Sequence, residues 1–432
     1  MERKIMERLK KWKNSSRRMP LLLDGARQVG KTYTALMFGK SEYKNTVYIN
    51  LEDSSEIQAV FERDFDVKRL IRELSARSGA TIIPEDTLIV FDEIQACERA
   101  LTSLKYFCEK APEYHIIAAG SLLGVALKRD NYSFPVGKVD RETLYPLDFE
   151  EFLWAMDQKP LCDLIRNASQ EFIPFSLHET AMDLYREYLI VGGMPQPVSV
   201  YAETKDFNFV LAAQKSLNDA YIADMAKYAT PRETIRIMGA WGSIPAQLSK
   251  ENHKFQYRII KSGARAYEYE IPLQWMESAG IIHRCIRVRE GKLPLTAYEE
   301  PDAFKVYMAD TGLLCSKFGI SPNLILTGES RLDGFKDALA ENYVMQALVA
   351  QGIRQYYWAQ QQNAELDFVY QDKKGNIIPV EVKSAEHVRS RSLGIFMKRY
   401  DCSYALRVSA KNFGYENGIR SIPLYAVFCI CP

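Results

Sequence analysis

Gly25-Ala26-Arg27-Gln28-Val29-Gly30-Lys31-Thr32 is the stretch that decides the fold of the first third of this chain. It fits GxxxxGK[ST] at every fixed position, with a predicted strand before it and a predicted helix after it. Glycines let the backbone bend around phosphates so that N–H groups point inward, and the helix N-terminus adds the positive end of its dipole. We therefore predict that Gly25–Thr32 bind the phosphates of ATP. Lys31 would contact the β- and γ-phosphates, and Thr32 would ligate Mg²⁺.

A second apolar run, Thr87 to Asp92, ends in two acids, Asp92 and Glu93. Phosphoryl transfer depends on positioning and charge neutralisation, so Asp92 suits the Mg²⁺ site and Glu93 suits activation of the attacking water. A third run, residues 115–120, ends at Ser121, whose hydroxyl would sense the γ-phosphate or the water. An accidental motif match would not explain this order of strand, helix and acidic strand.

Three basic residues are candidates for the positive charge that often stabilises the transition state of phosphoryl transfer. They are Arg129, Lys138 and Arg141, and the sequence does not choose among them. The alternative is that each is simply solvated.

Composition limits the classes of protein to which the chain can belong. A length of 432 residues predicts two to four domains. Lys plus Arg minus Asp plus Glu is 56 − 55 = +1, so affinity for nucleic acid would have to come from local patches. No run approaches the roughly 20 apolar residues that span a bilayer. Scattered cysteines and histidines predict a reduced, cytoplasmic protein without structural zinc and without a membrane partner.

The order of apolar patterns predicts an α/β multidomain fold. Strands at 20–24, 46–51, 87–92 and 115–120 alternate with helices, as in a parallel sheet, and the spacing then becomes helical to about residue 240. We predict a P-loop core at 1–145, a helical lid region at 146–240, a winged-helix-like segment at 241–299 and a second α/β domain at 300–432.

The winged-helix prediction depends on local charge and on a strand pair. Residues 241–297 hold nine Lys or Arg against five Glu, an excess of 9 − 5 = +4. A helix from Ser262 to Ala279 would precede a hairpin of residues 281–288 and 293–298, which would touch DNA phosphates. Three glutamates on that helix favour a structural or regulatory role instead.

A second candidate site lies near the C-terminus. A hairpin predicted over 366–383 would bring Asp367 opposite Glu381, with Lys383 on the same face and Glu341 nearby on the preceding helix. Carboxylate oxygens and a lysine can hold Mg²⁺ and activate water for phosphodiester hydrolysis. This is the D…ExK arrangement of restriction-endonuclease-like nucleases. The alternative is a hairpin with ordinary surface charges.

Several motifs together resemble a family of prokaryotic AAA-type ATPases that carry a C-terminal domain of uncharacterised function and lie close to the archaeal ATPases. The segments are GARQVGKT at 25–32, VFDEIQ at 90–95, AAGSLLG at 118–124, LYPLDFEEFL at 144–153, YLIVGGMP at 188–195, FKVYMADTGLL at 304–314 and ALAENYV at 338–344. The resemblance implies a P-loop domain, a winged-helix segment and a restriction-endonuclease-like domain. Many members have Arg where this chain has Lys138, which weakens an arginine-finger role here.

Two functions follow as hypotheses. The first is a Mg²⁺-dependent, ATP-hydrolysing enzyme coupled to DNA binding or processing by the nuclease-like domain. The second is an ATP-dependent signalling switch, in which an inactive nuclease fold binds a protein partner or further copies of the chain. An inert nucleotide-binding scaffold is a third, less favoured reading.

Overall fold

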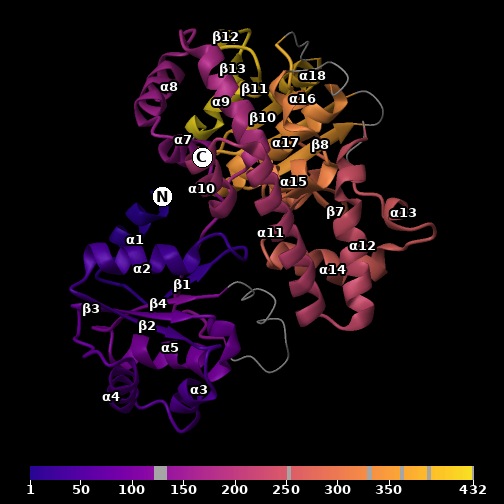
Figure 1. The fold of residues 1–432 in the computed structure, drawn as a ribbon. Helices are drawn as coiled ribbons and strands as arrows, with labels where there is room; N and C mark the ends of the chain where they lie inside the picture. The colour runs from indigo at the N-terminus through magenta and orange to yellow at the C-terminus, as the bar shows by residue number, and fades with distance from the viewer. Residues whose placement is uncertain (121–133, 251–253, 328–332, 361–363, 387–390, 431–432) are drawn as a thin grey trace. The chain divides into compact units, whose positions relative to one another are not determined.

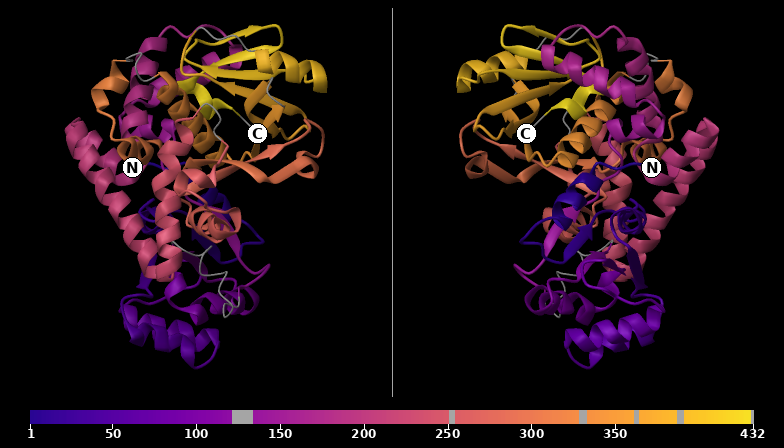
Figure 2. Two further views of the ribbon diagram at one scale, coloured as in Figure 1. Left: turned by 90° about the vertical axis from the view of Figure 1, so that its right-hand side faces the viewer. Right: turned by 90° about the vertical axis from the view of Figure 1, so that its left-hand side faces the viewer.

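The computed structural model describes residues 1–120, 134–250, 254–327, 333–360, 364–386 and 391–430. The chain forms two compact units (Figures 1 and 2). The N-terminal unit comprises residues 2–145 and 278–280, and the C-terminal unit comprises residues 146–277 and 281–432. Across the described ranges, none of the helices has both the length and the apolar character needed to cross a membrane.

A five-stranded parallel sheet organises the N-terminal unit. Its order is β2-β3-β4-β1-β5, so that β4 lies between β1 and β3. The four predicted strands are confirmed, and a fifth, polar strand was not predicted. The strands are β1 Leu21–Asp24, β2 Asn45–Asn50, β3 Thr87–Asp92, β4 His115–Ala119 and β5 Asp140–Thr143.

Helices cover both faces of this sheet. In Figure 1, α1 and α2 lie on one side of the strands, and α3, α4 and α5 lie on the other. All six residues of β3 are buried, as expected for a parallel strand covered on both faces. The helices are α1 Ile5–Lys13, α2 Lys31–Glu42, α3 Ser55–Glu62, α4 Val67–Ser78 and α5 Glu98–Lys110, with the short 3₁₀ helix η1 Ile94–Ala96 after β3.

The C-terminal unit is built on an eight-stranded mixed sheet of order β12-β13-β11-β10-β9-β8-β6-β7. Its strands are β6 Ile282–Val288, β7 Glu299–Met308, β8 Gln355–Gln360, β9 Ala364–Gln371, β10 Ile377–Val382, β11 Ala405–Ser409, β12 Gly414–Glu416 and β13 Ile419–Pro423. The hairpin predicted over 366–383 is present as β9 and β10, which pair antiparallel.

Helices make up most of the remainder of this unit, and the helical spacing predicted from residue 147 is confirmed. Before the sheet lie α7 Phe149–Ala155, α8 Lys159–Glu171, α9 His178–Val191, α10 Pro195–Thr204, α11 Phe207–Tyr228, α12 Pro231–Leu248, α13 Tyr257–Ile260 and α14 Ala266–Ser278. Later come η2 Leu295–Tyr298, α15 Thr311–Phe318, α16 Pro322–Leu326, α17 Asp333–Ala350, α18 Arg391–Tyr400 and η4 Leu424–Cys429. Of these, α17 packs on β7, β8 and β10, whereas α18 packs on β9 and β10.

The predicted wing hairpin was wrong in its second strand. Residues 293–298 were expected to pair with 281–288, but they contain the 3₁₀ helix η2, and β6 pairs with β7 instead. Pro294 cannot donate to a strand ladder, which disfavours pairing at that point. β6 also pairs in parallel with β8. The hairpin is therefore part of the C-terminal sheet and not a separate wing.

Candidate functional site

The phosphate-loop motif lies where its pattern predicts, between the end of β1 and the start of α2. Gly25, Gln28 and Gly30 have positive φ angles of 140°, 61° and 95°, so the backbone turns sharply between strand and helix. A Cβ atom on Gly25 would lie 2.2 Å from the carbonyl oxygen of Leu144. Only glycine fits there, because the loop passes directly against the chain that leaves β5.

Lys31 is buried at the first position of α2. Its Nζ donates to the carbonyl oxygens of Gly25, at 3.0 Å, and Ala26, at 2.9 Å. Burial lowers the pKa of the Lys31 ammonium to about 8, while nearby carboxylates, Glu93 first, act in the opposite direction. The ammonium thus lies inside the loop, where an added anion would favour its charged form.

The two residues predicted to hold Mg²⁺ are in contact. Thr32 Oγ1 donates a 2.8 Å hydrogen bond to Asp92 Oδ2, although 60 residues separate them in the sequence. The same Asp92 oxygen accepts a 3.0 Å hydrogen bond from the Tyr48 hydroxyl, and Asp92 Oδ1 accepts one from the Glu93 amide at 3.1 Å. A hydroxyl and a carboxylate are the hard oxygen ligands that Mg²⁺ prefers, so these side chains fit that ion.

Glu93 follows the end of β3 in a left-handed backbone conformation, with φ 49° and ψ 45°. A non-glycine residue adopts such angles at a cost, and strained positions of this kind cluster at functional sites. The Gln95 amide donates to a Glu93 carboxylate oxygen. This contact orients the carboxylate that is predicted to activate water.

The remaining predicted ATPase residues divide into two groups. Ser121 and Arg129 lie outside the described residues. Arg141 on β5 pairs with Asp24 at 3.3 Å, at the start of the phosphate loop, whereas Lys138 pairs with Glu109 at 3.1 Å. Of these two candidates, Arg141 is the one whose ion-pair partner, Asp24, directly precedes the phosphate loop.

Two residues near the loop were missed from the sequence. Arg3 was not singled out, but it is buried, and its guanidinium donates to the carbonyl oxygens of Val29 and Tyr145 at 3.2 and 2.6 Å. Tyr48 was not singled out, although it contacts Asp92. Neither residue belongs to a motif, and only the fold brings them to the loop.

The acid–lysine cluster near the C-terminus is assembled by the β9–β10 hairpin. The hairpin pairs Val380 with Phe368, and continuing this register by one residue places Glu381 opposite Asp367, in agreement with the prediction. The Val382 amide donates to Asp367 Oδ2 at 2.7 Å. Glu341 on α17, Asp367 and Glu381 are all buried, which is unusual for carboxylates and excludes the reading as ordinary surface charges.

Lys305 and Glu365 belong to this cluster but were not predicted from the sequence. Lys305 is 1% exposed on β7, and its Nζ lies 2.7 Å from Glu365 Oε1 and 3.8 Å from Glu341 Oε2. A lysine between apolar neighbours in a strand was the available signal. Lys305, Glu341, Glu365, Asp367, Glu381 and Lys383 are called the acid–lysine cluster below.

Burial and charge within the cluster act on its titratable groups. Burial, and then the nearby Glu341 carboxylate, raise the pKa of Asp367 to about 7. Burial tends to lower the pKa of Lys383, but the carboxylates led by Asp367 outweigh it and raise that pKa. Four members of the cluster, Lys305, Glu341, Asp367 and Glu381, therefore hold interacting charges away from bulk solvent.

The spacing of ligand atoms does not match a preformed three-carboxylate metal site. We asked which groups of three His, Cys, Asp or Glu side chains have ligand atoms that all lie within 4.8 Å of one another. Within the described ranges, His178, Glu179 and Glu386 meet this condition. The oxygens of Glu341, Asp367 and Glu381 do not meet that condition. His178 and Glu179 are adjacent in the sequence, but Glu386 lies far along the chain from them, so sequence spacing could not reveal the trio.

The basic residues of the predicted wing are paired with acids. Arg284 on β6 binds Glu277 at 2.5 Å, and Arg287 and Arg289 contact Glu300 at 3.3 and 3.6 Å. Three of the nine basic residues counted in this segment are therefore engaged by carboxylates. These contacts reduce the support for phosphate contacts along the hairpin.

Comparison with protein families assigns the first third of the chain to a known domain family. Residues 17–153 match the model of the AAA domain, and this range contains the phosphate loop, Asp92 and Glu93. Residues 182–324 and 336–427 match two models described as domains of unknown function, DUF8612 and DUF4143. With the five-stranded parallel sheet, the match shows that the chain contains a AAA-type P-loop ATPase domain. A search of curated proteins found no match.

Solved structures resemble the chain only remotely. The Walker-type ATPase of Pyrococcus abyssi is 16% identical, with 73% of this chain and 95% of that chain covered and a TM-score of 0.46. The Aeropyrum pernix ORC1 protein in complex with DNA is 10% identical, with coverage of 75% and 90% and a TM-score of 0.28. The Thermotoga maritima RuvB Holliday junction branch migration motor is 14% identical, with coverage of 65% and 88% and a TM-score of 0.32. Likenesses at this level carry no functional argument.

Proposed function

We propose that this protein is a Mg²⁺-dependent, ATP-hydrolysing AAA-type ATPase whose turnover is coupled to DNA binding or processing by a restriction-endonuclease-like C-terminal domain. The observation that carries the ATPase is the 2.8 Å hydrogen bond between Thr32 and Asp92. Mg²⁺ requires hard oxygen ligands in a compact arrangement, and these two oxygens already lie side by side. ATP and Mg²⁺ are accordingly the proposed cofactors.

Each residue of the loop region has a distinct role in this proposal. The backbone of Gly25–Thr32 binds the phosphates, and Lys31 moves its ammonium from the loop carbonyls to the β- and γ-phosphate oxygens. Thr32 and Asp92 hold the ion, which neutralises charge on the phosphates when bound. Glu93, held by Gln95, accepts a proton from the attacking water.

Substitution of Glu93 tests the ATPase. Glu93→Gln keeps the shape of the side chain but removes the base, so ATP should still bind while turnover falls by about 10²–10⁴-fold. Lys31→Ala should lose ATP binding itself. Glu113→Gln, which alters an exposed acid of the same unit, is the matched control and should leave both properties unchanged. Unaltered phosphate release by Glu93→Gln would refute the assignment of the base.

The acid–lysine cluster supports a metal-dependent nuclease as the coupled activity. Its four carboxylates and two lysines give a formal charge of 2 − 4 = −2. A divalent cation would balance that charge and could activate water for phosphodiester hydrolysis. Asp367, Glu381, Lys383 and Glu341 are the proposed site residues.

Lys305 favours a second candidate function, in which the nuclease fold is inactive and the protein is an ATP-dependent switch for a protein partner or for its own assembly. The Lys305 ammonium already compensates Glu341 and Glu365. The oxygens of Glu341, Asp367 and Glu381 are also not all within 4.8 Å of one another. A cluster of this kind can be stable without a metal.

A nuclease assay separates the two functions. Purified protein is incubated with linear and branched DNA, Mg²⁺ and ATP, and Lys383→Ala is compared with Lys374→Ala, an exposed lysine in the turn of the same hairpin. Cleavage that is lost only in Lys383→Ala supports the nuclease. Cleavage that survives in Lys383→Ala contradicts this site. Absence of cleavage, with ATPase activity that DNA does not stimulate even at low salt, selects the switch.

A further inference from the structure

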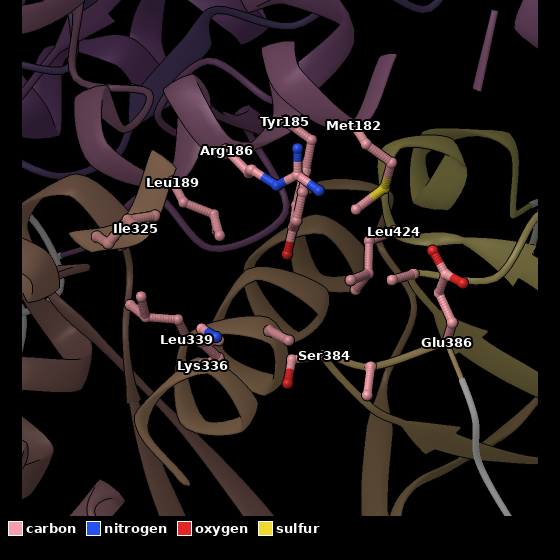
Figure 3. Close-up of a pocket in the computed structure, with 13 residues that line it drawn as sticks. Met182, Tyr185, Arg186, Leu189, Ile325, Lys336, Leu339, Ser384, Glu386 and Leu424 are labelled. Atoms are coloured by element: carbon pink, nitrogen blue, oxygen red, sulfur yellow. The ribbon is translucent and has the colours of Figure 1, made fainter. Parts of the chain in front are cut away.

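A pocket of about 240 Å³ opens in the C-terminal unit (Figure 3). Its walls come from α9, α16, α17, η4 and the segment that follows β10. Ser384 in this wall comes directly after Lys383, and its amide and hydroxyl both donate to Asp337 on α17, at 2.8 and 2.7 Å. The pocket therefore adjoins the acid–lysine cluster but is lined by different side chains.

A buried hydroxyl points to a ligand in this pocket. Tyr185 is 2% exposed, and within the part of the chain that the structure describes, its hydroxyl has no hydrogen-bond partner. Figure 3 shows the Tyr185 hydroxyl extending from α9 toward the space among the labelled residues. Burial raises the pKa of this phenol well above its ordinary value, so the group remains a donor. Leaving such a donor unsatisfied is costly, and an acceptor in the pocket would relieve that cost.

The charged groups of the lining have both signs. Arg186 on α9 and Lys336 on α17 are cationic, and Glu386 at the rim is anionic. Arg186 also pairs with Asp183 at 2.5 Å. A strongly anionic ligand such as a phosphate would meet these acids as well as the cations. A zwitterion can instead match each sign with its opposite.

Size and the apolar wall restrict the ligand further. Met182, Leu189, Leu339 and Leu424 supply apolar surface beside the polar groups, which is the usual composition of a small-molecule site. The cavity has room for a small molecule such as an amino acid.

We propose that this pocket binds a free amino acid with an apolar side chain. Its carboxylate lies beside Arg186 and Lys336 and accepts the Tyr185 hydroxyl, while its ammonium faces Glu386. The apolar side chain contacts the leucines. Bound ligand bridges α9, α17 and the segment after Lys383, so its presence restrains the end of β10. The proposal does not depend on ATP hydrolysis or on nuclease activity.

Calorimetric titration of the full chain tests the proposal. The probes are L-leucine, L-methionine and L-phenylalanine, with L-leucinamide lacking the carboxylate, isocaproate lacking the ammonium, and adenosine monophosphate as the nucleotide. At least one amino acid should bind, and leucinamide, isocaproate and the nucleotide should bind at least about tenfold more weakly or not at all.

A pair of tyrosine variants gives a matched control. Tyr185→Phe should weaken binding by about tenfold or more, the effect expected when a hydrogen bond to a charged carboxylate is lost. Tyr343→Phe removes a second buried hydroxyl that has no partner within the described ranges, but Tyr343 does not line the pocket, so binding should be unchanged. Binding of none of the amino acids at millimolar concentration would overturn the proposal. Equal binding of leucine and leucinamide, or equal effects of the two tyrosine variants, would also overturn it.

Discussion

Lys305→Met is expected to destabilise the C-terminal unit through the acids that it leaves behind. Methionine preserves most of the apolar stem but removes the ammonium that lies 2.7 Å from Glu365 and 3.8 Å from Glu341. Breaking a buried ion pair by removing one partner costs about 3–5 kcal/mol, because the remaining charge is uncompensated. The Glu365 side chain is 35% exposed and can turn to water, whereas Glu341 at 5% cannot. We therefore expect a loss near the lower end of that range, about 3 kcal/mol.

Urea denaturation followed by tryptophan fluorescence measures this loss, since Trp358 is buried in the same sheet. With slopes of about 1–3 kcal/mol per molar urea, the unfolding midpoint should fall by about 1–3 M. Lys292→Met is the control, because that lysine is 60% exposed and its pair with Glu290 should contribute less than about 1 kcal/mol. Adding Glu341→Gln to Lys305→Met should restore much of the stability, because the uncompensated charge is then removed.

Two results would refute this reasoning. One is a Lys305→Met protein whose midpoint matches the parent within error. The other is a double variant whose unfolding free energy is lower than that of Lys305→Met by the full effect of Glu341→Gln measured alone, as for two independent substitutions. Either would mean that Lys305 does not compensate Glu341.

Three further predictions concern the N-terminal unit. Gly25→Ala should abolish ATP binding, measured with a fluorescent ATP analogue, because the new Cβ would lie 2.2 Å from the Leu144 carbonyl oxygen. Burial lowers the pKa of His115 to about 4, so the native state binds fewer protons than the unfolded state between pH 6.5 and about 4. Stability of this unit should therefore fall as the pH drops through that window, by up to about 3 kcal/mol, and the His115→Leu variant should show a flatter pH profile of unfolding. Arg3→Gln should weaken ATP affinity severalfold in the same binding assay, because the guanidinium no longer holds the Val29 carbonyl of the loop.

The sequence predicted those strands, loops and turns whose formation depends on residues close together in the chain. The phosphate loop and the β1, β3 and β4 strands were found because their residues form short apolar runs that end in glycine or acids. The register of the β9–β10 hairpin agrees with the prediction that Asp367 faces Glu381, since a short turn fixes the register of a hairpin.

Features that depend on distant pairing were not predictable. β5 reads as a polar segment, Asp140–Thr143, and becomes a strand only because it pairs with β1. The strand that follows β6 was placed too early because η2 intervenes before β7. Lys305 carried the one local signal that was overlooked, a lysine between Phe304 and Val306 in a strand that proved to be buried.

The most direct test of the central claim is phosphate release from ATP by the parent protein and by Asp92→Asn, measured across a titration of Mg²⁺. We predict hydrolysis that stops when Mg²⁺ is chelated, and a shift to higher Mg²⁺ in the variant, because Asp92 loses a charged oxygen next to Thr32. Hydrolysis that continues in the presence of chelator, or identical Mg²⁺ dependence in the two proteins, would contradict the account.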